Sequence, residues 1–357
     1  MTPVRVAVVD DSSFIRKAVV RMLEGDDRIR VVGTARSGEE LIERLADWRP
    51  DVITLDLSMP GMGGLRTLDQ IMSSRPIPVI VLSGRSRDDA PLAIEALHRG
   101  AVDFVDKRRY SLVDFEALRD VLVHRILEVS GNRSAELGEE RAATPGAGAR
   151  RPARSRQSQQ RNDFEVVVIG ASTGGPVAIQ RVLVDLGTFL PVPAVVAQHM
   201  PPGFTRAFAE RLNNNLPLSV READDGETLL PATVYIAPAG QHLSIERRGV
   251  GLRTHLDDER GSAGSHLPSA DILFSSAARV AQRAVLAVLL TGMGRDGARG
   301  MADLATAGAY TLAQDEATSV VWGMPRAAAE LNAVRETLPL DDIGRRLRQL
   351  LGDDDAA

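Results

Sequence analysis

Cysteine is absent from the 357-residue sequence. Its absence excludes disulfide bonds and thiolate metal sites, and it is compatible with the cytoplasmic location that we expect. Aromatic residues make up only 4% of the chain, so the cores must be built from Val, Leu, Ile and Ala. No apolar run approaches the roughly 18–20 residues that span a bilayer, and the N-terminus lacks the features of a signal peptide. We therefore expect no membrane insertion.

The chain also lacks any excess of positive charge. Its formal net charge is −5, which gives no support for nucleic-acid binding. A content of 44% apolar and 25% charged residues is ordinary for a globular protein. The length favours more than one domain, and we expect a monomer of two domains that binds no nucleic acid.

Residues 1–128 alternate short apolar runs with helical patterns. The runs are almost continuously apolar, which indicates strands buried on both faces of a sheet. We predict these strands at residues 4–9, 29–34, 52–55, 79–82 and 102–105. The helical patterns between them, the first capped by Ser12 or Ser13, predict a flavodoxin-like, doubly wound parallel sheet.

Polar residues follow four of these strands at their carboxyl ends: Asp10 and Asp11, Asp56, Ser83, and Lys107. In such folds these ends meet at one edge of the sheet, where ligands bind. Each residue alone has a structural explanation, such as a helix cap, but together they suggest a site. Three carboxylates need a hard cation such as Mg²⁺ between them, and a lysine and a hydroxyl could hold a phosphoryl group. Asp56 is then the natural phosphoryl acceptor.

This segment resembles a response-regulator receiver domain. The resemblance rests on Val8-Val-Asp-Asp-Ser12, Leu55-Asp-Leu-Ser-Met-Pro-Gly-Met-Gly-Gly-Leu65, Val81-Leu-Ser83 and Gly100-Ala-Val-Asp-Phe-Val-Asp-Lys107. It implies that a chemotaxis-type histidine kinase phosphorylates Asp56, and that Asp11 and Asp56 hold Mg²⁺ with help from Asp10. It also implies that Ser83 and Phe104 form the switch pair. The sequence departs from the family at Gly63-Gly64, at Arg108 after the lysine, and at Ser58.

Residues 129–163 show no hydrophobic periodicity. They contain glycine, proline, a Ser/Gln run and seven arginines. This composition predicts a flexible linker. A nucleic-acid or membrane-surface patch is the alternative, but the stretch has neither lysines nor interleaved aromatic residues.

Residues 164–351 begin a second α/β pattern, and an acidic tail follows at 352–357. We predict strands at residues 166–169, 194–197, 234–237, 285–290 and 310–313. We predict helices near residues 177–186, 205–213, 269–281, 297–307 and 343–351. The pattern favours a second doubly wound α/β domain.

The stretch Gly170-Ala-Ser-Thr-Gly-Gly175 lies between the first of these strands and its helix. Its Gly-x-Ser-x-Gly spacing matches a nucleophile elbow, which presents Ser172 at the end of a strand. The same glycines could instead form a phosphate-binding loop at a helix N-terminus. A dinucleotide site would need an acidic residue at the end of the next strand, and a Walker loop would need a lysine. Both are missing, so the sequence favours the exposed hydroxyl.

Two further strands end in reactive residues. His199 follows the strand at 194–197, and Asp296 lies in a glycine-rich turn after the strand at 285–290. With Ser172 they have the composition of a hydrolytic triad, although the chain order Ser, His, Asp differs from that of α/β-hydrolases. Alone, the serine could be a turn residue, the histidine a core residue and the aspartate a cap of the following helix. His242 and His266 are lesser candidates.

The second domain resembles the catalytic domain of the CheB-type chemotaxis methylesterases. The resemblance rests on Ile169-Gly-Ala-Ser-Thr-Gly-Gly175, Gln198-His-Met-Pro201, Tyr235-Ile-Ala-Pro-Ala-Gly240, Pro268-Ser-Ala-Asp271, Leu290-Thr-Gly-Met-Gly-Arg-Asp-Gly-Ala298 and Val321-Trp-Gly-Met-Pro325. It implies hydrolysis of γ-glutamyl methyl esters on chemoreceptors, with release of methanol, and deamidation of receptor glutamines. It implies Ser172, His199 and Asp296 as the triad, the Met293 N–H as an oxyanion donor, and no cofactor for the esterase chemistry.

Three expectations complete this interpretation. Elbow geometry suggests the Thr173 N–H as a second oxyanion donor. The two-domain order and the family suggest that the unphosphorylated receiver covers Ser172 until Asp56 is phosphorylated. The alternative is a phosphorylation-dependent adaptor whose second domain binds a partner without catalysis.

Overall fold

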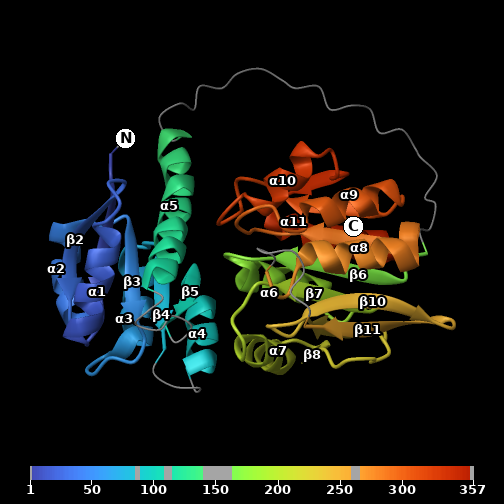
Figure 1. Ribbon diagram of the computed structural model, residues 1–357, viewed down its shortest axis with the longest axis horizontal. Coiled ribbons are helices and arrows are strands. Elements are labelled where there is room, and N and C mark those ends of the chain that lie inside the picture. The colour runs from blue at the N-terminus through green and yellow to red at the C-terminus, as the bar shows by residue number, and fades with distance from the viewer. Residues whose placement is uncertain (1, 85–88, 108–114, 140–162, 259–265, 354–357) are drawn as a thin grey trace.

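The computed structural model describes residues 2–84, 89–107, 115–139, 163–258 and 266–353 (Figure 1). These residues form a five-stranded sheet, a seven-stranded sheet and a two-stranded antiparallel hairpin. The five-stranded sheet belongs to the N-terminal part of the chain, and the other two belong to the C-terminal part. The predicted fold class, two parallel-sheet α/β domains, is therefore confirmed.

The N-terminal sheet is parallel and has the strand order β2-β1-β3-β4-β5. Its strands are β1 (Val4–Val9), β2 (Ile29–Ala35), β3 (Val52–Asp56), β4 (Val79–Ser83) and β5 (Asp103–Asp106). The order places β1 and β3 side by side at the centre, so the residues that follow them come close together.

Five helices cover the two faces of this sheet. They are α1 (Ser13–Leu23), α2 (Gly38–Trp48), α3 (Gly63–Ser74), α4 (Asp89–His98) and α5 (Phe115–Glu139). One face packs on α1 and α5 through a cluster that includes Val8, Leu23 and Leu122. Helices α2, α3 and α4 cover the opposite face. Ser12 caps α1 by accepting a hydrogen bond from the Ile15 N–H, as the sequence predicted.

The C-terminal sheet is parallel, with the order β14-β13-β12-β6-β7-β9-β8. Its strands are β6 (Val166–Ala171), β7 (Ala194–Gln198), β8 (Ser219–Glu222), β9 (Thr233–Ile236), β12 (Val285–Leu289), β13 (Tyr310–Gln314) and β14 (Glu336–Leu338). The strands that precede the three candidate residues, β6, β7 and β12, are neighbours at the centre of the sheet.

Helices and the hairpin cover this second sheet. They are α6 (Gly175–Leu186), α7 (Phe204–Asn215), α8 (Ala270–Ala281), α9 (Ala298–Thr306), α10 (Met324–Glu330), α11 (Leu340–Leu351), β10 (His242–Arg248) and β11 (Gly251–Asp257). One face packs on α6, α7 and α11. The other packs on α8, α9, α10 and the hairpin.

The structure adds elements that the sequence did not predict. They are the edge strands β8 and β14, the hairpin β10–β11 and the short helix α10. In the hairpin, Leu243 and Ile245 are buried while Ser244 and Glu246 are more exposed, an alternation that signals a half-buried strand. The short edge strands carry a weaker pattern because one residue of β8 and none of β14 is buried.

Helix α5 runs eleven residues past position 128, the predicted end of the first domain, to Glu139. Val129 and Ser130 are still buried, so the helix keeps contacts with the protein beyond the predicted boundary. The rest of the predicted linker, 140–162, lies outside the described residues, as does most of the acidic tail, at 354–357. No helix in the described parts of the chain combines the length and apolar character needed to cross a membrane.

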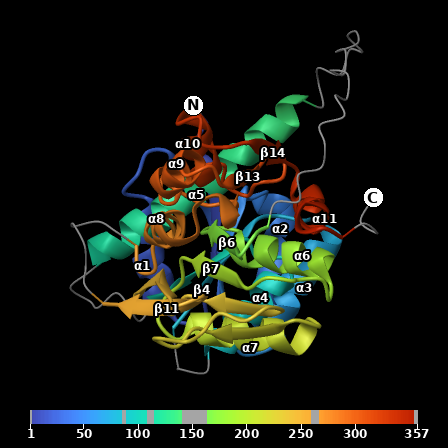
Figure 2. The ribbon, with the colours of Figure 1, turned by 90° about the vertical axis from the view of Figure 1, so that its right-hand side faces the viewer.

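The two halves meet through α4 on one side and α7 on the other (Figures 1 and 2). The ring of Phe104, on β5, stacks on the ring of Phe204, the first residue of α7, with centroids 4.5 Å apart. Glu95 on α4 forms an ion pair with Arg211 on α7. The buried apolar residues of α4 belong to the same hydrophobic cluster as those of α6 and α7. The N-terminal half is therefore packed against the element that follows His199.

Candidate active site and phosphoryl-acceptor site

Ser172 lies in a tight turn between β6 and α6. The Gly175 N–H donates to the Ser172 carbonyl at 2.8 Å, and Gly174 has φ +74°, a value that glycine adopts without strain. These features define a type II turn. The Ser172 N–H donates to the carbonyl of Thr291 at 3.0 Å, which ties the turn to the end of β12. Pro176 occupies the first turn of α6, where its missing N–H costs no helical hydrogen bond.

His199 joins the serine to the aspartate. Its Nδ1 lies 3.1 Å from Ser172 Oγ, and its Nε2 lies 2.7 Å from Asp296 Oδ2. An ionised carboxylate only accepts hydrogen bonds, so the proton belongs on Nε2 and the lone pair of Nδ1 faces the hydroxyl. The histidine side chain is only 8% exposed. The structure thus brings together the three residues that the sequence singled out.

Asp296 is anchored by four donors. Its Oδ1 accepts from Ser269 Oγ at 2.7 Å and from the Asp271 N–H at 3.1 Å, and its Oδ2 accepts from the Ala270 N–H at 2.7 Å and from His199. Burial alone would raise the pKa of this carboxyl, but the hydrogen bonds lower it well below its usual range. A carboxylate at the N-terminus of α8 is further favoured by the helix dipole.

Asp296 caps a helix, as the sequence suggested that it could, but the helix is not the expected one. The sequence suggested that it could cap the helix after it, but the N-cap of α9 is Gly297, which makes no side-chain cap bond. Asp296 instead caps α8, a helix that precedes it in the chain. This placement leaves Oδ2 free to accept from the histidine as well.

Two backbone N–H groups are candidate oxyanion donors. Those of Thr173 and Met293 donate to no protein acceptor within the described residues. Gly292 packs directly against the serine, since a Cβ built on it would lie 2.8 Å from Ser172 Cβ. A side chain at position 292 would push the turn that carries Met293 away from Ser172.

The two lesser histidine candidates both lie near the triad. The ring of His266 stacks on that of His199, with centroids 4.2 Å apart and an angle of 3° between the planes. Desolvation and the nearby His199 lower the pKa of His266. His242 is 3% exposed, and burial lowers its pKa. Neither of its ring nitrogens has a hydrogen-bond partner in the described portion of the chain.

Several residues of the site were not predicted from the sequence. Ser269 is the N-cap of α8 and also holds Asp296. Gln198 donates from its side-chain amide to the carbonyls of Ser172 and His199. Thr291 donates from its hydroxyl to the Thr173 carbonyl. All three lie beside a predicted site residue or inside a quoted motif, so adjacency was the only available signal.

The N-terminal half carries a second cluster at the ends of β1 and β3. Asp10, Asp11 and Asp56 place carboxylate oxygens within 4.8 Å of one another. Lys107 Nζ lies 2.9 Å from Asp10 Oδ2 and 3.0 Å from Asp56 Oδ1. Asp10 and Asp56 are almost fully buried. All-oxygen ligands at this spacing suit a hard divalent cation.

Ser83, at the end of β4, completes this cluster. Its hydroxyl is buried and has no hydrogen-bond partner among the residues that the structure describes. A buried hydroxyl without a partner costs free energy unless a ligand satisfies it, so it fits an incoming phosphoryl oxygen. Phe104 is also buried, and its ring faces Phe204 in the other half of the protein.

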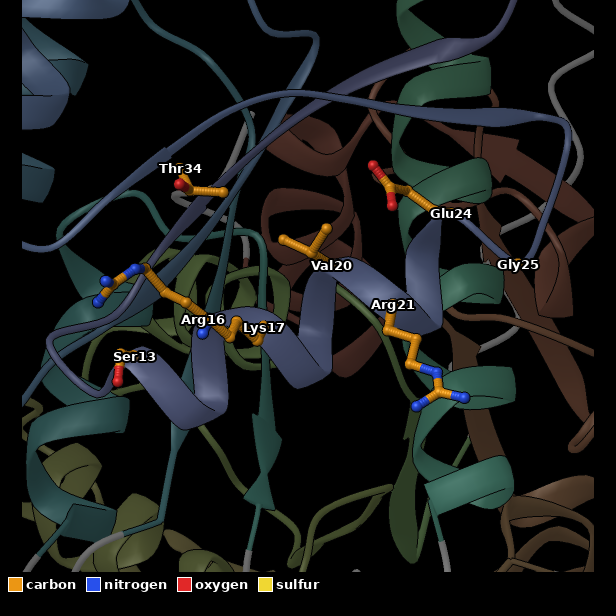
Figure 3. A pocket seen from close by; sticks show the side chains of 8 residues that line it. All are labelled: Ser13, Arg16, Lys17, Val20, Arg21, Glu24, Gly25 and Thr34. Carbon is orange, nitrogen blue, oxygen red and sulfur yellow. The ribbon is translucent and has the colours of Figure 1, made fainter.

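A hollow of about 620 Å³ lies elsewhere on the N-terminal half, along α1 (Figure 3). Arg16, Lys17 and Arg21 line it, and Thr34 and Glu24 complete its wall. Arg16 also donates to the carbonyls of Asp10 and Asp11, so part of its hydrogen-bonding capacity is already taken up. The lining includes neither the triad nor the carboxylates of the acidic cluster.

Family models match both halves of the chain. Residues 6–118 match the response regulator receiver domain, and residues 167–347 match the CheB methylesterase. The chain belongs to the CheB methylesterase family. The residues Ser172, His199 and Asp296 all lie inside the segment that matches the methylesterase model.

Curated CheB-family relatives match along almost the whole chain. A protein-glutamate methylesterase/protein-glutamine glutaminase of Halalkalibacterium halodurans is 40% identical over 341 residues, covering 95% of each chain. The protein of that name from Geobacillus kaustophilus is 41% identical over 355 residues, covering 99% of this chain and 100% of its own. The CheB methylesterase catalytic domain of Thermotoga maritima has a solved structure similar to this one, with 38% identity and a TM-score of 0.51. It covers 52% of this chain and 98% of its own.

Proposed function

We propose that this protein is a phosphorylation-regulated protein-glutamate methylesterase that also deamidates glutamine. Its substrates are γ-glutamyl methyl esters and specific glutamines on chemoreceptors, and methanol or ammonia is released. The observation that carries the proposal is the continuous chain of contacts from Ser172 Oγ through His199 to Asp296. The curated names of the relatives support the choice of substrate. A cytoplasmic location is part of the proposal.

The esterase reaction proceeds through an acyl-enzyme. Ser172 Oγ attacks the ester carbonyl carbon while its proton passes to His199 Nδ1. Asp296, held ionised by its four donors, stabilises the imidazolium through Nε2. When the tetrahedral intermediate collapses, His199 returns the proton to the departing methoxide, and methanol leaves. Water then repeats the sequence on the acyl-enzyme and releases the glutamate carboxylate.

Negative charge on the carbonyl oxygen must be stabilised in both steps. The N–H groups of Thr173 and Met293 are the donors that we assign to this oxyanion. Deamidation uses the same groups, with ammonia as the leaving group in place of methanol.

Regulation acts through the receiver half. Asp56 is the phosphoryl acceptor, and a histidine kinase of the chemotaxis type is the donor. Asp11 and Asp56, helped by Asp10, would hold Mg²⁺, which when bound supplies positive charge to the transferring phosphoryl group. Lys107 and the Ser83 hydroxyl bind phosphoryl oxygens, and Ser83 and Phe104 form the switch pair.

The unphosphorylated receiver restricts access to Ser172. Phe104 contacts Phe204, which lies five residues after His199 in the chain. The positive charge of Arg125, on α5, contributes to lowering the pKa of His266, which stacks on His199. Phosphorylation adds about −1.5 to −2 charges at the end of β3 and biases this interface toward opening. Residues 164–357 alone should therefore show more esterase activity than the unphosphorylated full chain, and equal activity would exclude this regulation.

Release of labelled methanol from methylated receptor membranes tests the proposed activity directly. The full chain, given a small-molecule phosphodonor and Mg²⁺, should release methanol, and Ser172→Ala should abolish almost all of the release. A phosphorylation-dependent adaptor would bind the receptors without releasing methanol. Wild-type release by Ser172→Ala would contradict the proposal.

A further inference from the structure

The side chain of Gln198 connects the turn of the nucleophile to the turn of the base. Gln198 is the last residue of β7 and is only 1% exposed. Its Nε2 donates to the carbonyl of Ser172 at 2.8 Å and to the carbonyl of His199 at 3.1 Å. One buried amide therefore spans the two loops whose spacing decides whether Nδ1 reaches the hydroxyl.

The orientation of this amide follows from its neighbours. Both nearby acceptors are carbonyl oxygens, so the NH₂ group must face them and the oxygen must point away. Gln198 Oε1 is directed at Gly175, where a Cβ would lie only 2.0 Å from it. The Ser172 carbonyl thus receives two donors, the Gln198 amide and the Gly175 N–H.

Holding that carbonyl also sets the direction of the next N–H. The peptide between Ser172 and Thr173 is trans, because the cis bond of the described chain is Leu267–Pro268. In a planar trans peptide, the N–H points opposite to the C=O. With the Ser172 carbonyl held toward Gln198 and Gly175, the Thr173 N–H is aimed away from them. No protein acceptor of the described chain contacts that N–H.

We propose that Gln198 is a positioning residue that orients the Thr173 N–H as an oxyanion donor and holds the spacing between Ser172 and His199. The inference rests on the proposed esterase function. As the bond between Ser172 Oγ and the carbonyl carbon forms, the π electrons move onto the carbonyl oxygen and the hydroxyl proton goes to His199 Nδ1. A peptide already fixed in the donating orientation stabilises that oxygen without reorganising.

Two substitutions of similar size test this role in the full chain activated with acetyl phosphate and Mg²⁺. Gln198→Met removes both donors, and we expect kcat for methanol release to fall about 10–100-fold with KM within about threefold, because misplaced groups slow the chemical step. Gln198→Glu keeps the shape but places a carboxylate against two carbonyls. Burial and this repulsion should raise its pKa, and only the protonated form can donate to Ser172.

The pH dependence separates positioning from simple packing. The activity of Gln198→Glu, divided by that of wild type at the same pH, should rise as the pH is lowered from 9 to 6. The division removes the titration of groups that both proteins share. A ratio that stays flat across this range would overturn the inference, and so would an unchanged kcat in Gln198→Met. If Gln198→Met does not fold, as judged by circular dichroism, the pH profile of Gln198→Glu decides alone.

A parallel measurement on Ser172→Ala distinguishes failure of the proposed esterase function from failure of the role proposed for Gln198. Full activity in Ser172→Ala would remove the proposed function and this inference with it. An inactive Ser172→Ala together with an unimpaired Gln198→Met would leave the function standing and remove only the role of Gln198.

Discussion

The carboxyl ends of the two parallel sheets use the same positions for opposite electrostatic arrangements. At the receiver edge, three carboxylates crowd within 4.8 Å and Lys107 contacts two of them. At the methylesterase edge, one carboxylate, Asp296, faces a histidine and a hydroxyl, and four donors hold it. The first edge keeps an excess of negative charge, whereas hydrogen bonds compensate the single carboxylate of the second.

This difference teaches what each edge needs before it can act. Three carboxylates that share one lysine attract a further cation, so we expect the receiver edge to depend on a metal ion and a phosphodonor from outside. The compensated edge already holds its base and its hydroxyl in contact, so it needs only substrate and access. We therefore propose that one kind of strand-end site serves as a switch in one half and as a reaction centre in the other.

Substituting the key residue of each edge should have the largest effect, because each variant should lose one of the two reactions and keep the other. Asp56→Asn should abolish phosphoryl incorporation from labelled acetyl phosphate with Mg²⁺, because the acceptor oxygen is lost. Ser172→Ala should incorporate phosphoryl to the wild-type extent while releasing no methanol. Phosphoryl incorporation into Asp56→Asn at the wild-type level would show that the acceptor lies elsewhere.

Neutralising the carboxylate at the methylesterase edge should give the next largest effect. Asp296→Asn keeps the size of the side chain but can no longer stabilise the imidazolium, and we expect kcat to fall by about 10³–10⁴-fold. Asp303→Asn is the matched control, since this exposed acid on α9 accepts from Ser275 Oγ and takes no part in holding Asp296. Methanol release by the control should stay within about threefold of wild type. Similar losses in both variants would argue against the triad.

Much of this arrangement followed from the sequence because strand ends are easy to locate. Buried parallel strands are continuous apolar runs, and the polar residue that ends each run must lie at the ligand-binding edge. That reasoning placed Asp56 and Ser83 on one sheet and Ser172 and His199 on the other. It required no knowledge of side-chain contacts.

What could not be predicted depends on contacts between distant segments. That His199 turns Nδ1 rather than Nε2 to the serine depends on the position of its ring between two loops. That Asp296 caps α8 instead of the next helix depends on how α8 packs beside β12. The role of Gln198 depends on the Ser172 carbonyl, which reaches it from the turn after the neighbouring strand β6. No local pattern encodes any of the three.

A partly buried acid in the receiver half, Glu128, can be compared with Asp296. Glu128 on α5 has a buried Oε2 with no hydrogen-bond partner among the described residues, and burial raises its pKa to about 7. The folded state therefore holds a proton that the unfolded state releases near its usual pKa of about 4.5, so stability falls as the pH rises from about 4.5 to 7. Asp296 shows the opposite shift because its donors outweigh burial.

Removing the ionisable group at Glu128 should remove this loss of stability at higher pH. Glu128→Gln should raise the free energy of unfolding by about 1–2 kcal/mol at pH 8 and change it little near pH 4.5. Urea denaturation at the two pH values, followed by circular dichroism, measures the difference. An equal gain at both pH values would mean that the effect comes from packing and not from the titration of Glu128.

Weakening the contact between the two halves should have the smallest effect on the rate of methanol release. Arg211→Ala removes the ion pair between α7 and Glu95 on α4, and a partly exposed pair of this kind is worth about 0.2–1 kcal/mol. If the receiver restricts access to Ser172, the unphosphorylated variant should release methanol about 1.5–5-fold faster than wild type, since every 1.4 kcal/mol is tenfold. Arg206→Ala, on the same helix but paired with Glu210 at 3.1 Å, is the matched control and should leave the rate unchanged. Equal rates in the two variants would mean that this ion pair does not hold the receiver over the site.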